Sequence, residues 1–275
     1  MPDYLDTLIR AVEVADSSLL LQEAVKNLAA ARLEGAVPTL IASLSYNNPG
    51  AAVAAVDGLI QIGEPAVPGL LELLDLHNYT ARSWAIRALA GIGDPRGLVT
   101  LLGAATADFA LSVRRAAARG LGMMKWHWFP DELLEIAQAE ALEALLFVAQ
   151  EDDEWVVRYS AVVGLQFLAD AIAVTYPEWR SQIDFQFEQM AVKDNSWAVR
   201  ARALMAQQQL QAKTATVQPV TDDRSSPLSS MDWQKIMEGL YGRKGQERQQ
   251  QLVFAEGDPR RYQELAVAIA QNTDE

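Results

Sequence analysis

The chain has 275 residues, half of them hydrophobic and 8% aromatic, which is enough apolar material for a sizeable core and excludes a wholly disordered protein. Its formal net charge of −13 argues against a general attraction to nucleic acid or to an anionic membrane surface. The absence of cysteine excludes disulfides, thiolate metal sites and cysteine nucleophiles. Because His77 and His127 are the only imidazoles, we expect no metal site.

No apolar run approaches the roughly 20 residues that span a bilayer. The first residues also lack a basic segment followed by an apolar one. We therefore expect a cytoplasmic protein that does not insert into membranes.

The first clear pattern along the chain is an internal repeat. The segment EPAVPGLLELL at 64–74 follows an apolar stretch that ends in Ile-Gly, and DPRGLVTLL at 94–102 follows another, with equivalent residues thirty positions apart. Glycine allows a left-handed C-cap, and proline suits the first turn of the next helix. Each unit is therefore interpreted as a helix, a Gly-Asp/Glu-Pro break and a second helix.

The starts of the second helices align across five units. Their shared position is occupied by Ala52, Arg82, Arg114, Arg158 and Arg200. Six units, counting a degenerate one around residues 17–45, fill residues 1–212, with longer first helices expected over 131–150 and 177–193. Because one such unit buries too little apolar surface alone, neighbouring units must stack. The sequence predicts an all-α fold, a HEAT-repeat α-solenoid of about six helix pairs.

The repeat pattern stops after residue 212. Residues 213–230 are rich in Thr, Ser, Asp and Pro and are typical of a flexible linker. Residues 231–275 form a short helical C-terminal extension in the prediction. Its first helix carries an apolar stripe that includes Trp233 and Leu240, and its second begins at Asp258.

Charge is unevenly distributed along the repeats. Residues 79–119 hold six arginines and two acids, whereas residues 131–154 hold nine acids and no base. Arg115 and Arg119 lie four apart on one helical face, where their mutual repulsion favours an acidic ligand or partner. Arginines at the position of Arg82 have a structural alternative, which is to bond neighbouring loops and acids. Asp57, Arg87 and Arg119 are equivalent positions as well, so we expect an Asp–Arg ladder there.

The aromatic residues gather near helix starts and loops. Trp126, His127, Trp128 and Phe129 are either a contact surface or a filling of the inter-repeat connection. Trp155 and Trp197 are equivalent in their units, and we expect them to be packing residues. Asp108 precedes a second helix and either caps it or offers a carboxylate to a ligand.

Four segments of the repeats resemble the HEAT-repeat bilin lyases of cyanobacteria, and in particular the F-type subunits of the E/F-type phycocyanobilin lyase for the phycocyanin alpha subunit. They are YNNPGAAVAAVDGLIQIG (46–63), HNYTARSWAIRALAGIGDPRGL (77–98), DFALSVRRAAARGLG (108–122) and EWVVRYSAVVGLQ (154–166). The resemblance spans about residues 5–212. It implies that an E-type and an F-type subunit pair, bind a linear tetrapyrrole and attach it as a thioether to a phycobiliprotein cysteine.

The resemblance implies phycocyanobilin as substrate and no permanently bound cofactor. The implied partners are an E-type HEAT-repeat subunit and a phycobiliprotein alpha subunit. Such a lyase needs arginines for two propionates, carboxylates for pyrrole N–H groups and rings beside a flat chromophore. No catalytic residue is assigned. The candidate contacts for bilin or partner are Tyr79, Arg82, Trp84, Arg87, Asp108, Arg114, Arg115, Arg119, Trp126, His127, Trp128, Arg158 and Tyr159. The alternative function is a non-catalytic adaptor, in phycobilisome assembly or turnover or in binding an iron–sulfur carrier.

Overall fold

The structure is a computed structural model that describes residues 2–74, 79–214 and 233–243. The chain divides into two units, Met1–Ser229 and Ser230–Glu275, which are described separately. Every regular element in the described ranges is helical. The α-helices of the first unit are α1 Pro2–Glu13, α2 Ser18–Ala30, α3 Val37–Ser43, α4 Pro49–Ile62, α5 Val67–Leu74, α6 Tyr79–Ile92, α7 Leu98–Ala107, α8 Leu111–Gly122, α9 Asp131–Glu151, α10 Trp155–Ile172, α11 Pro177–Lys193 and α12 Trp197–Thr214. The predicted all-α stack of six helix pairs is confirmed, and so are the two longer first helices, α9 and α11.

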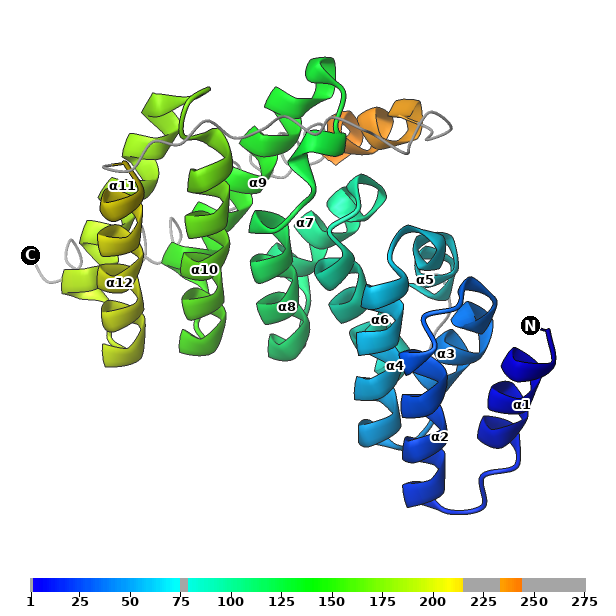
Figure 1. Ribbon diagram of the computed structural model, residues 1–275. Coiled ribbons are helices and arrows are strands. Elements are labelled where there is room, and N and C mark those ends of the chain that lie inside the picture. Colours follow the sequence, from blue (N-terminus) through cyan, green and yellow to red (C-terminus); the bar gives the residue numbers. More distant parts are fainter. Residues whose placement is uncertain (1, 75–78, 215–232, 244–275) are drawn as a thin grey trace, which may run out of the picture. The chain divides into compact units, whose positions relative to one another are not determined.

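The even-numbered helices form one layer of the stack. In Figure 1, α4, α6, α8, α10 and α12 lie side by side, and each packs against the next. The odd-numbered helices pack against the other side, α3 on α4, α5 on α6, α7 on α8, α9 on α10 and α11 on α12. One side of the even-numbered layer is therefore covered by the odd-numbered helices.

The Gly-Asp/Glu-Pro break has the predicted backbone but a different place in the repeat. Gly63 and Gly93 have φ of 80° and 69°, in the left-handed region that glycine favours. Each is followed by a short 3-10 helix, η2 Glu64–Ala66 or η3 Pro95–Gly97. These turns direct α5 onto α6 and α7 mainly onto α8, and the contact of α7 with the preceding helix, α6, is smaller. The break therefore separates units, and its predicted position inside a unit is wrong.

Small residues set the distance between α8 and α10. A Cβ atom built on Gly122 would lie 2.0 Å from the Gly164 carbonyl oxygen, and one on Gly164 would lie 2.4 Å from the Ala118 carbonyl oxygen. The two helices are thus in backbone contact, which side chains larger than glycine would prevent. This contact brings the exposed faces of α8 and α10 into one continuous surface.

Helix α10 has the length and composition of a membrane span, the one such helix among residues 2–74, 79–214 and 233–243. It packs against α8 and α12, and 61% of it is buried. A core helix of a repeat stack passes the same test, so this is weak evidence for a membrane segment.

The second unit is described over residues 233–243, which form one helix. This is the first of the two helices predicted for the extension, and the helix predicted to begin at Asp258 lies outside the described residues. Lys213 and Thr214, which the prediction assigned to the linker, continue α12. The rest of the predicted linker, up to residue 230, also lies outside the described residues.

Replacing Gly164 with alanine should lower the free energy of unfolding by about 1–3 kcal/mol, because the added methyl group overlaps the Ala118 carbonyl oxygen. Denaturant unfolding followed by circular dichroism measures this loss. Gly103→Ala is the matched control, since nothing lies within 4 Å of a Cβ at that helical position. It should leave stability unchanged or raise it by about 0.5–1 kcal/mol. Equal effects of the two variants would contradict the backbone contact.

Candidate functional site

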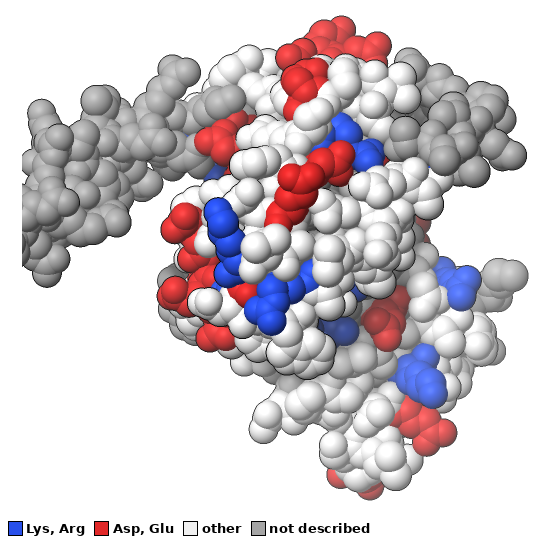
Figure 2. Space-filling view, turned by 90° about the vertical axis from the view of Figure 1, so that its left-hand side faces the viewer, with Lys and Arg blue, Asp and Glu red and all other residues white. Residues whose placement is uncertain are grey.

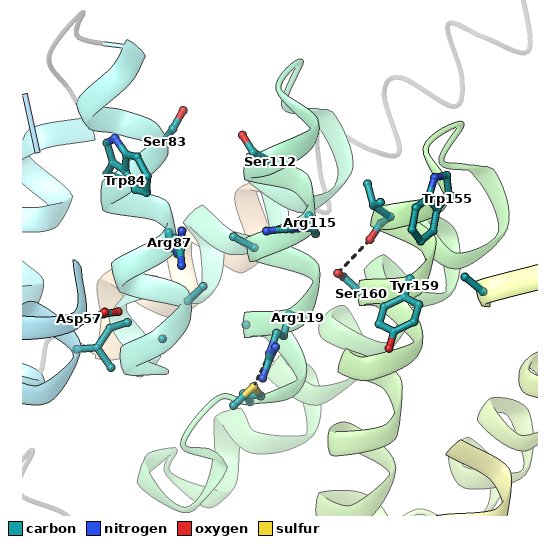
Figure 3. A pocket seen from close by; sticks show the side chains of 18 residues that line it. Asp57, Ser83, Trp84, Arg87, Ser112, Arg115, Arg119, Trp155, Tyr159 and Ser160 are labelled. Carbon is teal, nitrogen blue, oxygen red and sulfur yellow. Dashed lines mark hydrogen bonds between the residues drawn. The ribbon is translucent and has the colours of Figure 1, made fainter. Parts of the chain in front are cut away.

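A groove of about 820 Å³ lies on the even-numbered layer, on residues from α4, α6, α8, α10 and α12. We call it the arginine groove. Its polar and aromatic lining consists of Asp57, Ser83, Trp84, Arg87, Ser112, Arg115, Arg119, Trp155, Tyr159 and Ser160. Figure 3 shows these side chains on neighbouring helices, with α8 between α6 and α10. The groove therefore exists only in the assembled stack.

The helical period and the repeat register together place these residues in the groove. Arg115 and Arg119 lie one turn apart on α8, as Trp155 and Tyr159 do on α10. Ser83, Arg115 and Tyr159 each follow the aligned arginine of their unit, so stacking places them at the same level of α6, α8 and α10. Five of the thirteen candidate residues meet in this groove. They are Trp84, Arg87, Arg115, Arg119 and Tyr159.

Positive charge dominates the groove. Arg87, Arg115 and Arg119 line it with one carboxylate, Asp57. Within the described ranges none of the three arginines forms an ion pair, and Arg115 forms no hydrogen bond either. The Arg119 Nε–H points at the Met123 sulfur, 3.5 Å away, a weak acceptor. These guanidinium groups are therefore available to an anionic ligand.

The expected ladder of Asp57, Arg87 and Arg119 is wrong. Asp57 makes no ion pair with Arg87 in the part of the chain that the structure describes. The Arg87 guanidinium instead lies 5.6 Å from the centre of the Trp84 ring, one turn earlier on the same helix. A cation over an aromatic face gains less than a carboxylate contact, so Arg87 keeps its hydrogen-bonding capacity.

Aromatic rings stand on both sides of the arginines. Trp84 lies on α6, and Trp155 and Tyr159 lie on α10, with the α8 arginines between them (Figure 3). Rings offer flat apolar contacts, and guanidinium groups bind carboxylates in a bidentate manner. The arrangement is suited to a flat, conjugated molecule that carries carboxylates.

Three other candidate arginines join one repeat to the next. We call these contacts the loop ladder, and its pairs are Arg82–Asp108, Arg114–Asp152 and Arg158–Asp194. The structural alternative raised for these arginines is what the structure shows. Their carboxylate partners lie in the loops before α8, α10 and α12.

Each loop of the ladder also receives a second arginine. The Arg114 Nε lies 2.7 Å from the Asp152 carboxylate, while its Nη1 donates to the Asp108 main-chain oxygen at 2.9 Å. Arg158 repeats the pattern one unit later, with its Nε 2.7 Å from Asp194 and its Nη1 2.8 Å from the Asp152 main-chain oxygen. The carboxylate hydrogen bonds raise the pKa of both arginines. The ladder arginines are thus occupied.

Asp108 is a member of the loop ladder rather than the N-cap of α8. That N-cap is Ala110, whose N–H donates to one Asp108 carboxylate oxygen, and Arg82 pairs with the other. The Asp108 side chain is almost fully buried. The predicted capping role is wrong, because the loop needs the carboxylate two residues earlier to fix its own turn.

The sequence prediction missed Asp152 and Asp194. The signal was present, because an aspartate stands six residues before Arg114, Arg158 and Arg200. This Asp-x5-Arg spacing recurs in three units and marks the turn that the second arginine contacts.

The remaining candidates lie apart from the groove lining. Trp126 and Trp128 belong to η4 Trp126–Trp128, with the Trp126 ring 5.4 Å from Phe129 and the Lys125 ammonium 3.9 Å from the Trp128 ring. His127 is exposed between them. Tyr79 begins α6, and its side chain lies outside the described part of the chain.

Trp155 and Trp197 are exposed, by 47% and 75%, so the packing role expected for them is wrong. Each is the first residue of its helix, α10 or α12, and so lies at the edge of the even-numbered layer where these helices begin. Leu111 has the same place on α8 and is 43% exposed. We call Leu111, Trp155 and Trp197 the apolar edge.

The surface at the C-terminal end of the stack carries mixed charge. Figure 2 shows acidic and basic side chains interspersed on that face, where Arg180 pairs with Asp184 and Lys213 with Asp170. Among the described residues, no group of three histidine, aspartate or glutamate side chains is placed to hold a metal ion.

These features define a helical-repeat protein with an arginine-lined groove, and residues 67–166 match the family model for HEAT repeats. A relative from Pseudanabaena tenuis, a phycocyanobilin lyase subunit beta, is 63% identical over 284 residues, which cover all of both chains. The phycocyanin alpha phycocyanobilin lyase CpcF of Synechocystis sp. is 58% identical over 165 residues, 60% of this chain and 77% of the relative. The chain belongs to the family of phycocyanobilin lyase beta subunits.

A solved structure gives the same result. It is the complex of CpcE and CpcF of phycocyanin lyase from Nostoc sp. PCC7120, and one of its chains matches 63% of this chain and 98% of its own length. The match has a TM-score of 0.57 at 49% identity. The predicted resemblance to HEAT-repeat bilin lyases is confirmed. The Pseudanabaena alignment extends it beyond residues 5–212, through the C-terminal extension.

The loop ladder predicts acid sensitivity. Burial raises the pKa of Asp194, but hydrogen bonds from Arg158 and from the Ser196 N–H outweigh it, so the net pKa is below its ordinary value. The stability from this carboxylate is therefore present above the unfolded pKa of about 3.9 and is lost as the pH falls through the lower folded value.

Asp194→Asn should lose about 3 kcal/mol of stability at pH 7, since it leaves Arg158 without its carboxylate. On acidification below pH 7, the variant should lose less of its remaining stability than the wild type does. Denaturant midpoints at pH 7 and pH 3 test both statements. The control is Asp16→Asn, an exposed position, where a similar loss would contradict the ladder.

Proposed function

We propose that this chain is the F-type subunit of a bilin lyase. With an E-type HEAT-repeat subunit it helps to attach phycocyanobilin, as a thioether, to a cysteine of the phycocyanin alpha subunit in the cytoplasm. The observation that carries the proposal is the arginine groove, where three guanidinium groups lie close to aromatic rings and have no carboxylate partner among the described residues. Membership of the phycocyanobilin lyase beta-subunit family supports it.

Phycocyanobilin has the chemistry that the groove accepts. It is a linear conjugated tetrapyrrole with two propionates, and Arg87, Arg115 and Arg119 supply charge for these carboxylates. Trp84 and Tyr159 supply flat contacts for the pyrrole rings. Asp57 is the carboxylate of the groove lining and would accept hydrogen bonds from pyrrole N–H groups. The nucleophile is the acceptor's cysteine, so this chain contributes binding and orientation.

We place the acceptor protein on the apolar edge. Trp155 belongs both to this edge and to the groove lining, so a protein seated there lies next to a bound bilin. Exposed tryptophans that border a ligand groove are typical centres of protein contacts.

The proposal is tested by coexpression with an E-type subunit, apo-phycocyanin alpha subunit and phycocyanobilin. We expect a covalent, zinc-fluorescent adduct on the alpha subunit that depends on this chain. A stable complex with the E-type subunit that yields no adduct would contradict the lyase function and leave an adaptor role.

Replacing both Arg115 and Arg119 with glutamine should weaken phycocyanobilin binding about tenfold or more, because each loses a charge-assisted contact. The melting temperature should not fall, since neither arginine holds a carboxylate in the described structure. Arg180→Gln, which removes an arginine of α11 outside the groove, is the control for a general loss of charge. Unfolding of the double variant would show instead that these arginines are structural.

Trp197→Ser should raise the KM for the acceptor protein about tenfold while bilin affinity stays constant, because the side chain is three-quarters exposed and outside the groove lining. Steady-state adduct formation at varied acceptor concentration measures the change. Val192→Ser removes a similarly exposed apolar side chain from α11 and should have no effect. Identical KM values for all three proteins would exclude the apolar edge as the acceptor surface.

A further inference from the structure

Arg202 is a buried cation that lies outside the lining of the arginine groove. It lies on α12 and is 8% exposed. Its Nη2 donates to the Gln166 side-chain oxygen, and Gln166 in turn donates to Gln209 at 2.6 Å. The Arg202 Nη1 is buried and has no hydrogen-bond partner in the described structure. No carboxylate pairs with this guanidinium within residues 2–74, 79–214 and 233–243.

A buried guanidinium without a carboxylate partner lowers the stability of the fold. Burial opposes the charge and lowers the pKa of Arg202, and the nearby positive charge of Arg119 lowers it further. A buried charge normally needs a counter-ion and hydrogen bonds on every donor. An apolar side chain of similar length would fill the space without this cost, so packing alone does not account for an arginine here.

The place of Arg202 points to a ligand. Ala198, one turn earlier on α12, lines the arginine groove. The Arg202 Cζ lies 6.0 Å from the centre of the Tyr159 ring, which also lines the groove. Arg119 lines it from α8. Arg202 is thus adjacent to the groove lining, behind residues that a ligand would touch.

We propose that Arg119 and Arg202 form a second carboxylate-binding subsite on the α10–α12 side of the groove. A turn of the Tyr159 side chain opens the Arg202 guanidinium to the ligand. Arg87 and Arg115, on the α6–α8 side, bind the other carboxylate. The inference rests on the proposed function in taking a flat, conjugated dicarboxylate as the ligand. It specifies which arginines divide the two carboxylates between them.

The experiment compares the full-length wild type with Arg202→Met, each alone and with an E-type subunit. Binding of free phycocyanobilin and of its dimethyl ester is measured by spectroscopic titration, and thermal melting is measured in parallel. We expect Arg202→Met to be at least as stable as the wild type and to bind phycocyanobilin about tenfold more weakly. The dimethyl ester, which has no carboxylate, should bind both proteins equally. Arg180→Met is the control and should behave as the wild type.

Equal phycocyanobilin affinity of wild type and Arg202→Met would overturn the subsite and leave the proposed function intact. If the wild type binds the bilin neither alone nor together with the E-type subunit, the subsite and the proposed function are both overturned. If Arg202→Met does not fold, Arg119→Met tests the same subsite from the exposed side. Arg119→Met should bind phycocyanobilin more weakly and bind the ester as the wild type does. Unchanged affinity for phycocyanobilin would overturn the proposal.

Discussion

Each of three consecutive repeats is joined to the next by one guanidinium–carboxylate contact, and the register of the groove depends on it. Arg82, Arg114 and Arg158 reach forward to an aspartate in the following loop, and that aspartate fixes the turn from which the next helix starts. Because the contact sets where α8, α10 and α12 begin, it also sets which residues face the groove one turn later. A small shift at the loops would separate the arginines from the aromatic rings.

Two adjacent arginines illustrate how one helix serves both purposes. Arg114 and Arg115 are neighbours in sequence, but a helix turns by about 100° per residue, so their side chains point to different neighbours. Arg114 pairs with Asp152 and donates to the loop before α8, whereas Arg115 lies in the groove without a partner among the described residues. The ladder supplies stability, and the groove holds the charge that remains available.

The helices could be predicted from the sequence because their signals are local. Proline at the start of α11 and glycine at the end of α4 mark helix ends whatever surrounds them. The Gly-Pro break was assigned to the wrong place in the repeat because a local pattern predicts where a helix ends, but not which helix the next one packs against. Trp155 and Trp197 were misjudged for a related reason, since an aligned position can be exposed in every repeat as easily as buried. The spacing of Asp152 to Arg158 was a local signal for the turn, but the ion pair of Asp152 could not be predicted because its partner Arg114 lies 38 residues away.

The candidate site was predictable as a set of residue types and not as an arrangement. Arg115 and Arg119 could be paired from their spacing alone, but Tyr159 joins them through the stacking of α8 on α10. Arg202 had no distinguishing sequence signal, because its significance comes from burial and from unused hydrogen-bonding capacity.

The glycine contacts between helices are unevenly placed, and this affects how the stack can deform. Gly58 meets Ala29, Gly91 meets Ile60, Gly120 meets Ala90 and Gly122 meets Gly164, so every junction from α2 to α10 has a close contact at a glycine. The junction of α10 with α12 has side-chain hydrogen bonds from Gln166 instead. Close-packed contacts leave no room for sliding, whereas hydrogen bonds between long side chains can lengthen and re-form. The last junction in the described stack is therefore held by long polar side chains rather than by a glycine contact, and Tyr159 lies beside one of them, Arg202.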